Sequence, residues 1–503
     1  MKAAAKRNAS YAAALAIWTA FLFLCIGNSI STGLSYFDDA EMALVAQSLA
    51  RATGYSVAPE ADVAEPGQFQ SGISLGPALI VPCAIILKLL GSREVIPGLS
   101  AILVWGTLLT FLFFRVSRKV TPGHFLAGIA AFLVSILAVF TWQFAAWHAF
   151  LGEVTAAAFL LLGHWCLAME KLSAKWLLLS GLCLGLAAQT KYLAALGVLG
   201  AIVILLFRWR YCARPTVPQL MIWLAACLAP TLLFECWKLA ELGMAGYTRN
   251  WAALFQWMKI QGLASSSRSA FDIGRERLAV LQENFLVNLV GFAFLLLVSL
   301  RLALARRTQD WAGLFLGSQV SVFFLALYWV FFSIGLPRYL VIGMAMACFA
   351  MIIPILAWLR FRWAILYLGL CAMVLAGGLR RIPATATRAA DHGLFKATAE
   401  RHARKKIVQT IRGLQTPGPA EARVVGVVRR AEASAIEFSL DREVKFQRID
   451  SLGNLPGRKL VVINRLLGIP AHHTYIEEAL HGPISSVILL AGPYELLMVD
   501  TKL

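Results

Sequence analysis

Long apolar segments recur along the first three quarters of the chain, most of them close to the ~20 residues that cross the hydrocarbon core of a bilayer. Their hydrophobic residues run continuously and do not alternate with polar ones, which favours transmembrane helices over the strands of a membrane barrel. Eleven segments are predicted to span the membrane: 12–33, 97–114, 124–144, 150–169, 176–191, 193–207, 218–236, 284–304, 311–332, 339–357 and 363–379.

Two further segments are predicted as helices that do not cross. Ile73–Gly91 is apolar but contains Gly76-Pro77, Pro82 and Lys88. Counting it as a span would move the basic connections after it to the side opposite the basic N-terminus, so we expect a lateral or re-entrant helix. The residues from the acidic cluster at 38–41 up to Tyr55 are predicted to form an amphipathic helix lying on the bilayer.

Charge gives the predicted orientation. Lys and Arg gather in short connections that all fall on one side of the eleven-span arrangement, which the positive-inside rule makes cytoplasmic, together with the N-terminus. These residues are Lys2, Lys6, Arg7, Arg115, Arg118, Lys119, Lys171, Lys175, Arg208, Arg210, Arg214, Arg301, Arg306, Arg307, Arg360 and Arg362. The exoplasmic side then receives two long loops, 34–96 and 237–283, and everything after the last span. The first apolar segment lacks a small-residue cleavage site and is expected to remain as an anchor.

Composition narrows the class of protein. Of the 503 residues, 59% are hydrophobic, as expected for a membrane protein, and the net charge of +19 is explained by the basic connections without a nucleic-acid partner. The 9 cysteines show no metal-ligand spacing and none lies in the hydrophilic C-terminal part, so no disulfide framework is predicted. The Ala- and Arg-rich usage indicates a bacterial inner (plasma) membrane.

The C-terminal part, 380–503, is predicted to be a small exoplasmic or periplasmic α/β domain following a transmembrane domain at 1–379. Five short β-rich segments occur at 422–428, 444–449, 459–464, 485–490 and 495–499. Helical segments are expected at 391–412 and near 431–439 and 471–480. This alternation favours a partly parallel sheet.

An acidic cluster, Asp38-Asp39-Ala40-Glu41, directly follows the first apolar segment. Carboxylates at a membrane surface are costly to desolvate and gain nothing from anionic lipid, so they indicate a function at this position. The alternative is structural, because Asp is a preferred residue at a helix N-terminus.

This cluster, with the small and apolar residues that lead to Gly54-Tyr55, resembles the first exoplasmic loop of the C-type (GT-C) glycosyltransferases. That superfamily includes protein O-mannosyltransferases and lipid A aminoarabinose transferases. Gly76-Pro77, Gly152-Glu153, Thr190-Lys191 and Arg338-Tyr339 follow in the same order as similar features of the family. The resemblance covers roughly residues 12–360 and implies a multi-spanning helical GT-C fold.

The resemblance implies a membrane glycosyltransferase that inverts the anomeric carbon while moving a sugar from a polyprenyl-phosphate donor to a lipid, glycan or protein acceptor. Asp38 is the expected base, with Asp39 beside it as orienter or alternate base, because desolvation near a membrane raises a carboxylate pKa.

Lys191, Arg338 and Arg249 are cations on the predicted exoplasmic side and suit phosphate recognition, with Tyr339 beside Arg338 and Glu153 as an acceptor-orienting or supporting acid. Snorkelling of the cations and an interfacial position of Glu153 are the structural alternatives.

The sequence gives no support for a metal. Some aminoarabinose transferases hold one through a Glu and a His on exoplasmic loops, whereas here Glu65–Gln70 precedes Gly76 and 237–283 contains no histidine. We therefore assign no metal ligand, and a divalent cation stays an unsupported option.

Two other classes are weighed against the enzyme. A transporter or flippase of lipid-linked sugars would be expected to show mid-span charge pairs or two similar halves, and neither is evident. A non-catalytic scaffold built around the C-terminal domain is the third reading.

Overall fold

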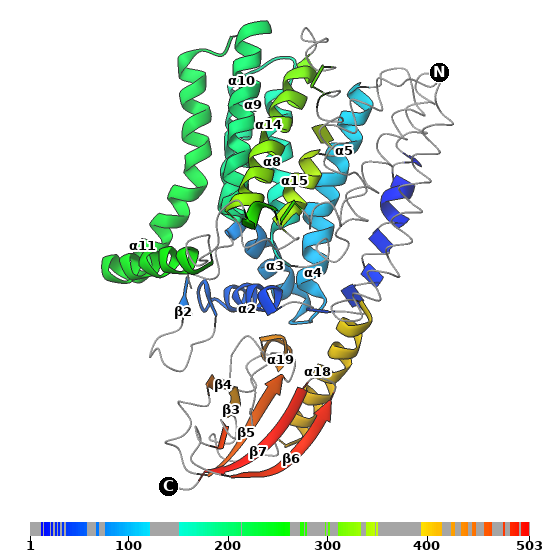
Figure 1. The fold of residues 1–503 in the computed structure, drawn as a ribbon, viewed down its shortest axis with the longest axis vertical. Coiled ribbons are helices and arrows are strands. Elements are labelled where there is room, and N and C mark those ends of the chain that lie inside the picture. The colour runs from blue at the N-terminus through cyan, green and yellow to red at the C-terminus, as the bar shows by residue number, and fades with distance from the viewer. Residues whose placement is uncertain are drawn as a thin grey trace.

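The computed structural model describes residues 33–34, 37–57, 67–69, 76–120, 150–212, 214–261, 310–332, 339–347, 349–350, 394–414, 424–427, 434–440, 445–448, 457–464, 476–477, 483–491 and 494–501, with isolated positions within 12–30, 272–278 and 297–301. Helices stand side by side in a bundle, and a β-sheet lies beyond one end of it (Figure 1).

The helices of the bundle coincide with or overlap the predicted spans. They are α4 (Ile96–Ser100), η1 (Ala101–Gly106), α5 (Thr107–Val120), α8 (Glu153–Leu167), α9 (Ala174–Thr190), η2 (Tyr192–Leu196), α10 (Gly197–Tyr211), α11 (Val217–Gln261), α14 (Asp310–Phe331) and α15 (Leu340–Ala347).

Four stretches in the described part are long and apolar enough to cross a membrane: Ile96–Lys119, Tyr192–Tyr211, Val217–Gln256 and Trp311–Phe331. They confirm the predicted spans that begin at 97, 193, 218 and 311. The predicted spans 12–33, 124–144, 284–304, 339–357 and 363–379 lie wholly or partly outside the described residues.

Helix α8 forms the centre of the bundle because it is apolar on every side. Nearly all of its residues are buried, including Ala156, Ala157 and Leu160. A helix that is hydrophobic all round needs neighbours or lipid on each face. The outer helices α10 and α11 instead expose large apolar side chains such as Leu206 and Leu233, as expected for a lipid-facing surface.

Basic connections meet at the end of the bundle away from the sheet. Lys119 Nζ donates to the Ala168 carbonyl oxygen at 3.4 Å, and an Arg208 guanidinium nitrogen donates to the Glu170 carbonyl oxygen at 3.2 Å. These bonds join the ends of α5, α8 and α10, so three of the predicted basic connections do lie together. The compartment that this end faces stays a prediction.

Helix α11 corrects the prediction of a loop at 237–283. The chain remains helical to Gln261, and only Gly243, with φ 63° and ψ 174°, departs from helical geometry. The helix turns there, so that its first part runs with the bundle and its second part lies across the bundle end (Figure 1). The apolar residues after 237 sustain the helix, and the break at Gly243 redirects it. The rest of the predicted loop lies mostly outside the described residues.

The acidic segment also differs from expectation. It forms α2 (Phe37–Ala50), but this helix is not amphipathic, because Ala40 and the residues Met42–Ser48 are buried on all its faces. Its position at the bilayer surface stays a prediction. α2 packs against α3 (Pro77–Leu90) on one side and α19 (Ser434–Leu440) on another. The prediction of an amphipathic helix was wrong because residues from the far end of the chain cover the face that would have met water.

Helix α3 is short: its 14 residues extend about 21 Å, less than the hydrocarbon core of a bilayer. Helix α8 lies within a predicted span and is nearly as short, with 15 residues, so length does not separate the two and the non-crossing position of α3 stays a prediction. The chain between α2 and α3 forms a short antiparallel pair, β1 (Ser56–Val57) with β2 (Gly67–Gln68).

The C-terminal part contains a five-stranded sheet of order β4-β3-β5-β7-β6. Its strands are β3 (Val424–Val427), β4 (Lys445–Arg448), β5 (Gly457–Asn464), β6 (Ile484–Ala491) and β7 (Tyr494–Thr501). β3 pairs in parallel with β4 and β5, and β7 pairs antiparallel with β5 and β6, so the five strand predictions and the partly parallel pairing are confirmed.

Two helices accompany this sheet. Helix α18 (Leu394–Leu414) matches the helix expected at 391–412, and α19 matches that expected near 431–439. Most of the expected helix at 471–480 and the boundary between 1–379 and 380–503 lie outside the described residues.

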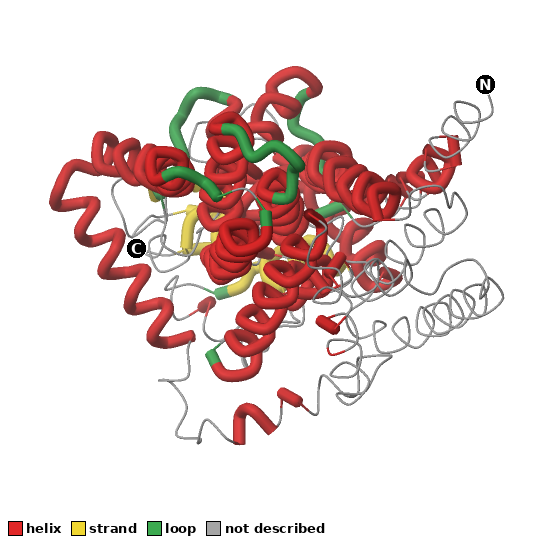
Figure 2. The backbone as a smooth tube through the Cα atoms, turned by 90° about the horizontal axis from the view of Figure 1, so that it is seen from above, coloured by secondary structure: helices red, strands yellow, loops and turns green. Residues whose placement is uncertain are grey.

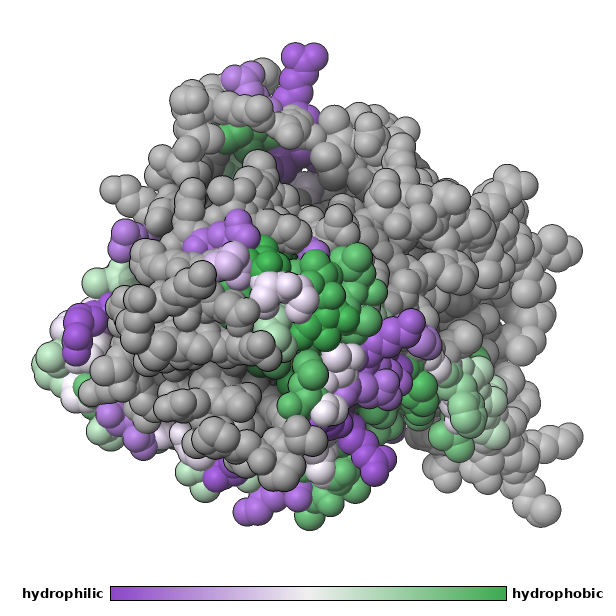
Figure 3. Space-filling model, turned by 90° about the horizontal axis from the view of Figure 1, so that it is seen from below, coloured by the Kyte–Doolittle hydropathy of each residue, from purple (hydrophilic) through white to green (hydrophobic). Residues whose placement is uncertain are grey.

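The sheet and α19 lie under the end of the bundle that carries α2. Viewed from above, the strands appear beneath the helices and not beside them (Figure 2). Seen from below, the described residues of this face include hydrophilic and hydrophobic side chains that lie close together (Figure 3). A face of mixed polarity suits contact with water better than burial in lipid.

Candidate functional site

An ion pair joins two of the predicted residues at this end of the bundle. Lys191 Nζ lies 3.2 Å from Glu153 Oε1, with side-chain exposures of 18% and 1%. Glu153 is the first residue of α8, and Lys191 caps the C-terminus of the following helix α9. The two helices form an antiparallel hairpin, so its open end brings the two residues together.

Each charge of this pair also suits the helix end on which it lies. An acid is stabilised by the positive N-terminal end of a helix and a cation by the negative C-terminal end. Local structure therefore explains why a buried Glu and a Lys are tolerated here. The Lys191 ammonium is still partly exposed, so an anionic ligand that competes with Glu153 can reach it.

Tyr339 is the third predicted residue at the site. The Lys191 ammonium lies 5.8 Å from the centroid of its ring, within the range of a cation–π contact. Tyr339 comes directly before α15, so residues from three separate parts of the chain meet around one cation.

Buried polar atoms near this pair lack hydrogen bonds. Glu153 Oε2 and both amide atoms of Gln189 have no hydrogen-bond partner within the described part of the chain, although each residue is only 1% exposed. Gln189 packs on Gly76, where an added Cβ would lie 2.6 Å from Gln189 Cγ. Buried polar groups are normally satisfied, so water or a ligand is expected to complete these bonds.

The sequence did not single out Gln189. It directly precedes Thr190-Lys191, and a polar amide at the end of an apolar helix was the available signal. We add it to the candidate residues.

The acidic pair lies in the first turn of α2. Asp39 is buried and takes part in an interaction, while the Asp38 side chain lies outside what the structure describes. α2 packs on α3, and Gly76 at the start of α3 contacts Gln189, so the acidic helix and the Lys191 region are linked through α3. Phe150, just before α8, belongs to the same apolar cluster as Ala40 of α2.

The remaining predicted cations are not joined to this group. Arg338 lies outside the described residues. Arg249 lies exposed on the second part of α11, where its Nε donates to the Ala245 carbonyl oxygen at 3.3 Å. Its contacts in the described chain are therefore with its own helix.

A second cluster lies around the turn of α11. Lys238 Nζ is 3.3 Å from Glu235 Oε2 and lies over the rings of Phe234, Tyr247 and Trp251, at 6.0, 5.9 and 5.2 Å. Trp251 Nε1 donates to Glu235 Oε2 at 3.0 Å. These contacts join residues before and after Gly243, so they hold the two parts of α11 at their angle.

Aromatic packing connects this turn to the acidic segment. The rings of Tyr55, Phe69, Phe234 and Trp237 contact one another, with centroids 5.2–6.0 Å apart. Burial raises the pKa of Tyr55, and nearby Tyr192 adds to that rise, so Tyr55 is a neutral member of this cluster. Tyr192 directly follows Lys191.

No group of three or more His, Cys, Asp or Glu side chains that could hold a metal ion occurs among the residues described. Around the Lys191 ammonium, the described residues offer one carboxylate, from Glu153, and one amide, from Gln189, as possible metal donors. A cation beside the carboxylate disfavours a divalent metal at that position.

The fold is similar to that of solved membrane-protein structures. No protein-family model and no curated protein sequence matches the chain. Among solved structures, ArnT from Cupriavidus metallidurans in the apo state matches with a TM-score of 0.59 at 14% identity, covering 99% of this chain and 98% of that one. The same enzyme bound to undecaprenyl phosphate matches with a TM-score of 0.58 at 14% identity, covering 96% and 97%.

The chain thus shares the fold of ArnT over nearly its whole length. The expected GT-C resemblance is confirmed at the level of the fold.

Proposed function

We propose that this protein is an integral membrane glycosyltransferase that moves a sugar from a polyprenyl-phosphate donor to a lipid, glycan or protein acceptor. The observation that carries the proposal is the meeting of Glu153, Lys191 and Tyr339 at the bundle end that also holds the acidic helix α2. A partly exposed cation beside unpartnered buried polar atoms is a suitable site for an anionic, hydroxyl-rich ligand.

The donor phosphate is assigned to Lys191. Its ammonium is held by Glu153 at 3.2 Å, and a donor phosphate would compete with that carboxylate for it. Arg338 is the second proposed phosphate ligand, since a guanidinium binds phosphate in a bidentate manner. The neighbour in fold, ArnT, is bound to undecaprenyl phosphate, which is a polyprenyl phosphate, and this supports the same donor class here.

The sugar is assigned to the polar groups beside that cation. Gln189 and Glu153 offer an amide and a carboxylate oxygen to sugar hydroxyl groups, and these atoms lack partners in the described structure. Tyr339 provides a ring on which a sugar could stack while it also contacts Lys191. Arg249, exposed on α11, is proposed to contact the lipid or acceptor side of the site.

Asp38 is the proposed base, with Asp39 as orienter. The acceptor oxygen attacks the anomeric carbon, its proton moves to the Asp38 carboxylate, and the bond between that carbon and the phosphate oxygen breaks. The polyprenyl phosphate leaves with the bonding electrons and is stabilised by the cations. A single displacement inverts the anomeric configuration.

The proposed location is the inner membrane, with this end of the bundle on the exoplasmic side and the N-terminus in the cytoplasm. The basic connections at the other end support this orientation. The C-terminal α/β domain would then be periplasmic.

The test is transfer of labelled sugar from a synthetic polyprenyl-phosphate sugar by the purified full chain in lipid. Asp38→Asn is expected to lower kcat by about a hundredfold or more, since general-base catalysis contributes on the order of 10²–10⁴. Glu170→Gln, an exposed acid at the opposite end, is the matched control and should leave kcat unchanged. Full activity of Asp38→Asn would show that Asp38 is not the base, and the base would then be assigned to Asp39 or Glu153.

The alternative, a transporter or flippase of lipid-linked sugars, predicts a different result when the purified chain is reconstituted in lipid vesicles. The labelled donor would change leaflet without any transfer of sugar to an acceptor. Movement of the donor between leaflets without any new glycosidic product would support the transporter hypothesis and contradict the glycosyltransferase hypothesis.

A further inference from the structure

The acidic helix α2 is enclosed by residues from the C-terminal part of the chain. Gln47 Nε2 of α2 donates to the Phe438 carbonyl oxygen of α19 at 3.3 Å. Phe438 is fully buried in the same apolar cluster as Ala40 and Ala43 of α2. One face of α2, the helix that carries Asp38 and Asp39, is therefore shielded from water by α19.

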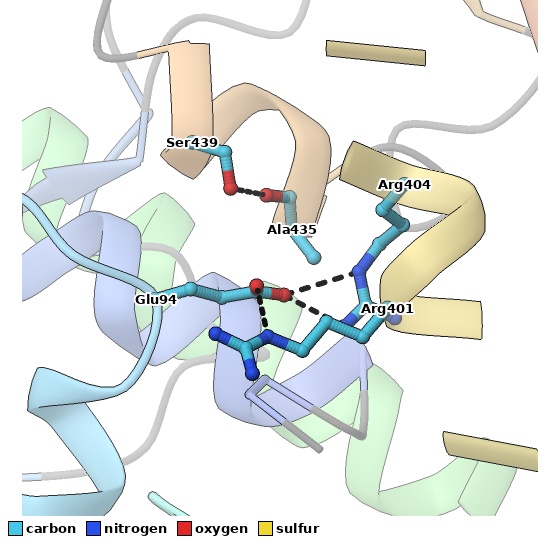
Figure 4. A network of polar contacts seen from close by, with 5 residues as sticks. All are labelled: Glu94, Arg401, Arg404, Ala435 and Ser439. Carbon is cyan, nitrogen blue, oxygen red and sulfur yellow. Dashed lines mark hydrogen bonds and ion pairs between the residues drawn. The ribbon is translucent and has the colours of Figure 1, made fainter. Parts of the chain in front are cut away.

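A charged contact lies beside this interface. Glu94, between α3 and α4, receives two arginines from α18: Arg401 Nε at 3.2 Å, and Arg404 through Nε at 3.1 Å and a terminal nitrogen at 2.6 Å. Figure 4 shows both guanidinium groups directed at the one carboxylate, close to α19. The exposures of Arg401 and Arg404 are 14% and 5%, so this is a shielded contact and not a surface ion pair.

The same carboxylate touches the chain just before α2. Gly33 has φ +62°, and a Cβ added to it would lie 2.6 Å from Glu94 Cδ and 2.8 and 2.9 Å from its two oxygens. The Glu94 carboxyl group therefore packs on the Gly33 backbone, and a larger residue would displace it. Glu94 connects the start of the acidic segment to α18.

The contact extends into the sheet. Burial opposes the charge of Arg404, but the Glu94 carboxylate raises its pKa, and Arg404 also has a side-chain hydrogen bond with Tyr494 of β7. An unbroken set of contacts runs from Gly33 through Glu94 and Arg404 to the sheet.

We infer that Glu94 is a positioning residue: with Arg401 and Arg404 it fixes the C-terminal domain against the bundle and so holds α2, and the acidic pair on it, in place. The inference deepens the proposed function and rests on it for the role of Asp38. It gives the C-terminal domain a part in assembling the site, without contact to substrate.

The Glu94 carboxylate compensates two positive charges at this interface. Two arginines share one carboxylate, so neutralising Glu94 leaves two shielded cations without their partner, and separation of the domain relieves this. Undocking would also expose Phe438 and the apolar face of α2 to water. The first turn of α2 would then lose the packing that fixes its direction.

The experiment uses the full chain in lipid nanodiscs and compares wild type with Glu94→Gln, which keeps the side-chain shape. Amide hydrogen exchange in 37–50 is expected to be about tenfold faster or more in the variant, with α8 and α9 unchanged, because opening is local. Faster exchange that is equal in all three helices, or no change in 37–50, would overturn the inference.

Kinetics give a second readout that general destabilisation would not reproduce. Glu94→Gln is expected to lower kcat about tenfold and to leave the donor KM within about twofold, since Lys191 and Glu153 lie on other helices. A raised donor KM with unchanged kcat would contradict the inference. If wild type itself transfers no sugar, the proposed function fails, while the exchange data still decide whether Glu94 holds α2.

Two further variants keep the test decisive if Glu94→Gln folds poorly. Arg401→Gln removes the more exposed partner and should raise exchange in 37–50 in the same direction, about threefold. The double variant Glu94→Gln/Arg404→Gln should show slower exchange in 37–50 than Glu94→Gln, because it removes one of the two cations that Glu94→Gln leaves without a carboxylate. Effects that multiply would show that the two residues act separately. Glu477→Gln, exposed on the same domain, is the control and should change nothing in α2.

Discussion

At the scale of single residues, the site is an arrangement of charges placed at helix ends. Glu153 begins α8 and Lys191 ends α9, so each is favoured where it stands before any ligand is considered. Their contact buries a carboxylate whose second oxygen has no partner in the described part of the molecule. The pair therefore has both a structural role and unused capacity for binding.

These two roles can be separated by mutation. Lys191→Met is expected to abolish transfer and also to destabilise the fold by roughly 3–5 kcal/mol, since it leaves Glu153 buried without its cation. Lys191→Met/Glu153→Gln should recover most of that stability, because neither charge remains, but not the activity. Thermal unfolding in detergent and the transfer assay measure the two effects. Recovery of transfer by the double variant would mean that the pair is structural only.

At the scale of elements, the turn of α11 decides which surface lies over the site. Val217–Gln256 is helical over 40 residues, about 60 Å as a straight helix and twice the thickness of a bilayer core. Gly243 divides it, and the Lys238 cluster fixes the angle between the parts. The second part thereby lies across the bundle end, with Asn250 Nδ2 donating to the Phe69 carbonyl oxygen.

Gly243→Ala tests whether this turn depends on glycine. The position combines φ 63° with ψ 174°, a region essentially restricted to glycine, and nothing lies within 4 Å of an added Cβ. The cost should therefore come from the backbone alone, about 1–3 kcal/mol, seen as a lower Tm.

Gly413→Ala is the matched control, because that glycine of α18 also has open space and no positive φ. It is expected to be neutral or to stabilise by about 0.5–1 kcal/mol. Equal losses in the two variants would show that the geometry at Gly243 is not strained for alanine.

At the scale of the whole molecule, the two ends of the bundle differ in chemistry. One end joins basic connections through Lys119 and Arg208, and the other gathers the acidic helix, the Lys191 site and the sheet. The positive-inside rule predicts that the basic end faces the cytoplasm.

Cysteine labelling in whole cells tests this orientation. With the native cysteines replaced, Ser486→Cys on exposed β6 should react with a membrane-impermeant maleimide in intact spheroplasts. Lys175→Cys at the other end should react only after permeabilisation. The reverse pattern would put the candidate site in the cytoplasm and exclude an exoplasmic transferase.

The sequence alone determined much of the secondary structure. Span length and hydropathy are local properties, so three spans, the five strands and α18 could be predicted within a few residues, and the fourth span was predicted correctly only at its start. The contact between Glu153 and Lys191 could also be predicted from the sequence, because two helices joined by a short connection bring their far ends together.

Only the tertiary structure decided what surrounds the acidic helix and how α11 is directed. α2 was expected to be amphipathic, but α19, some 390 residues further along the chain, covers it through Gln47 and Phe438. No local sequence pattern predicts that Glu94 meets Arg401 and Arg404, because these arginines lie 307 and 310 residues further along the chain. Contacts between such distant residues depend on how whole elements pack, and hydrophobic periodicity within one segment holds no information about that packing.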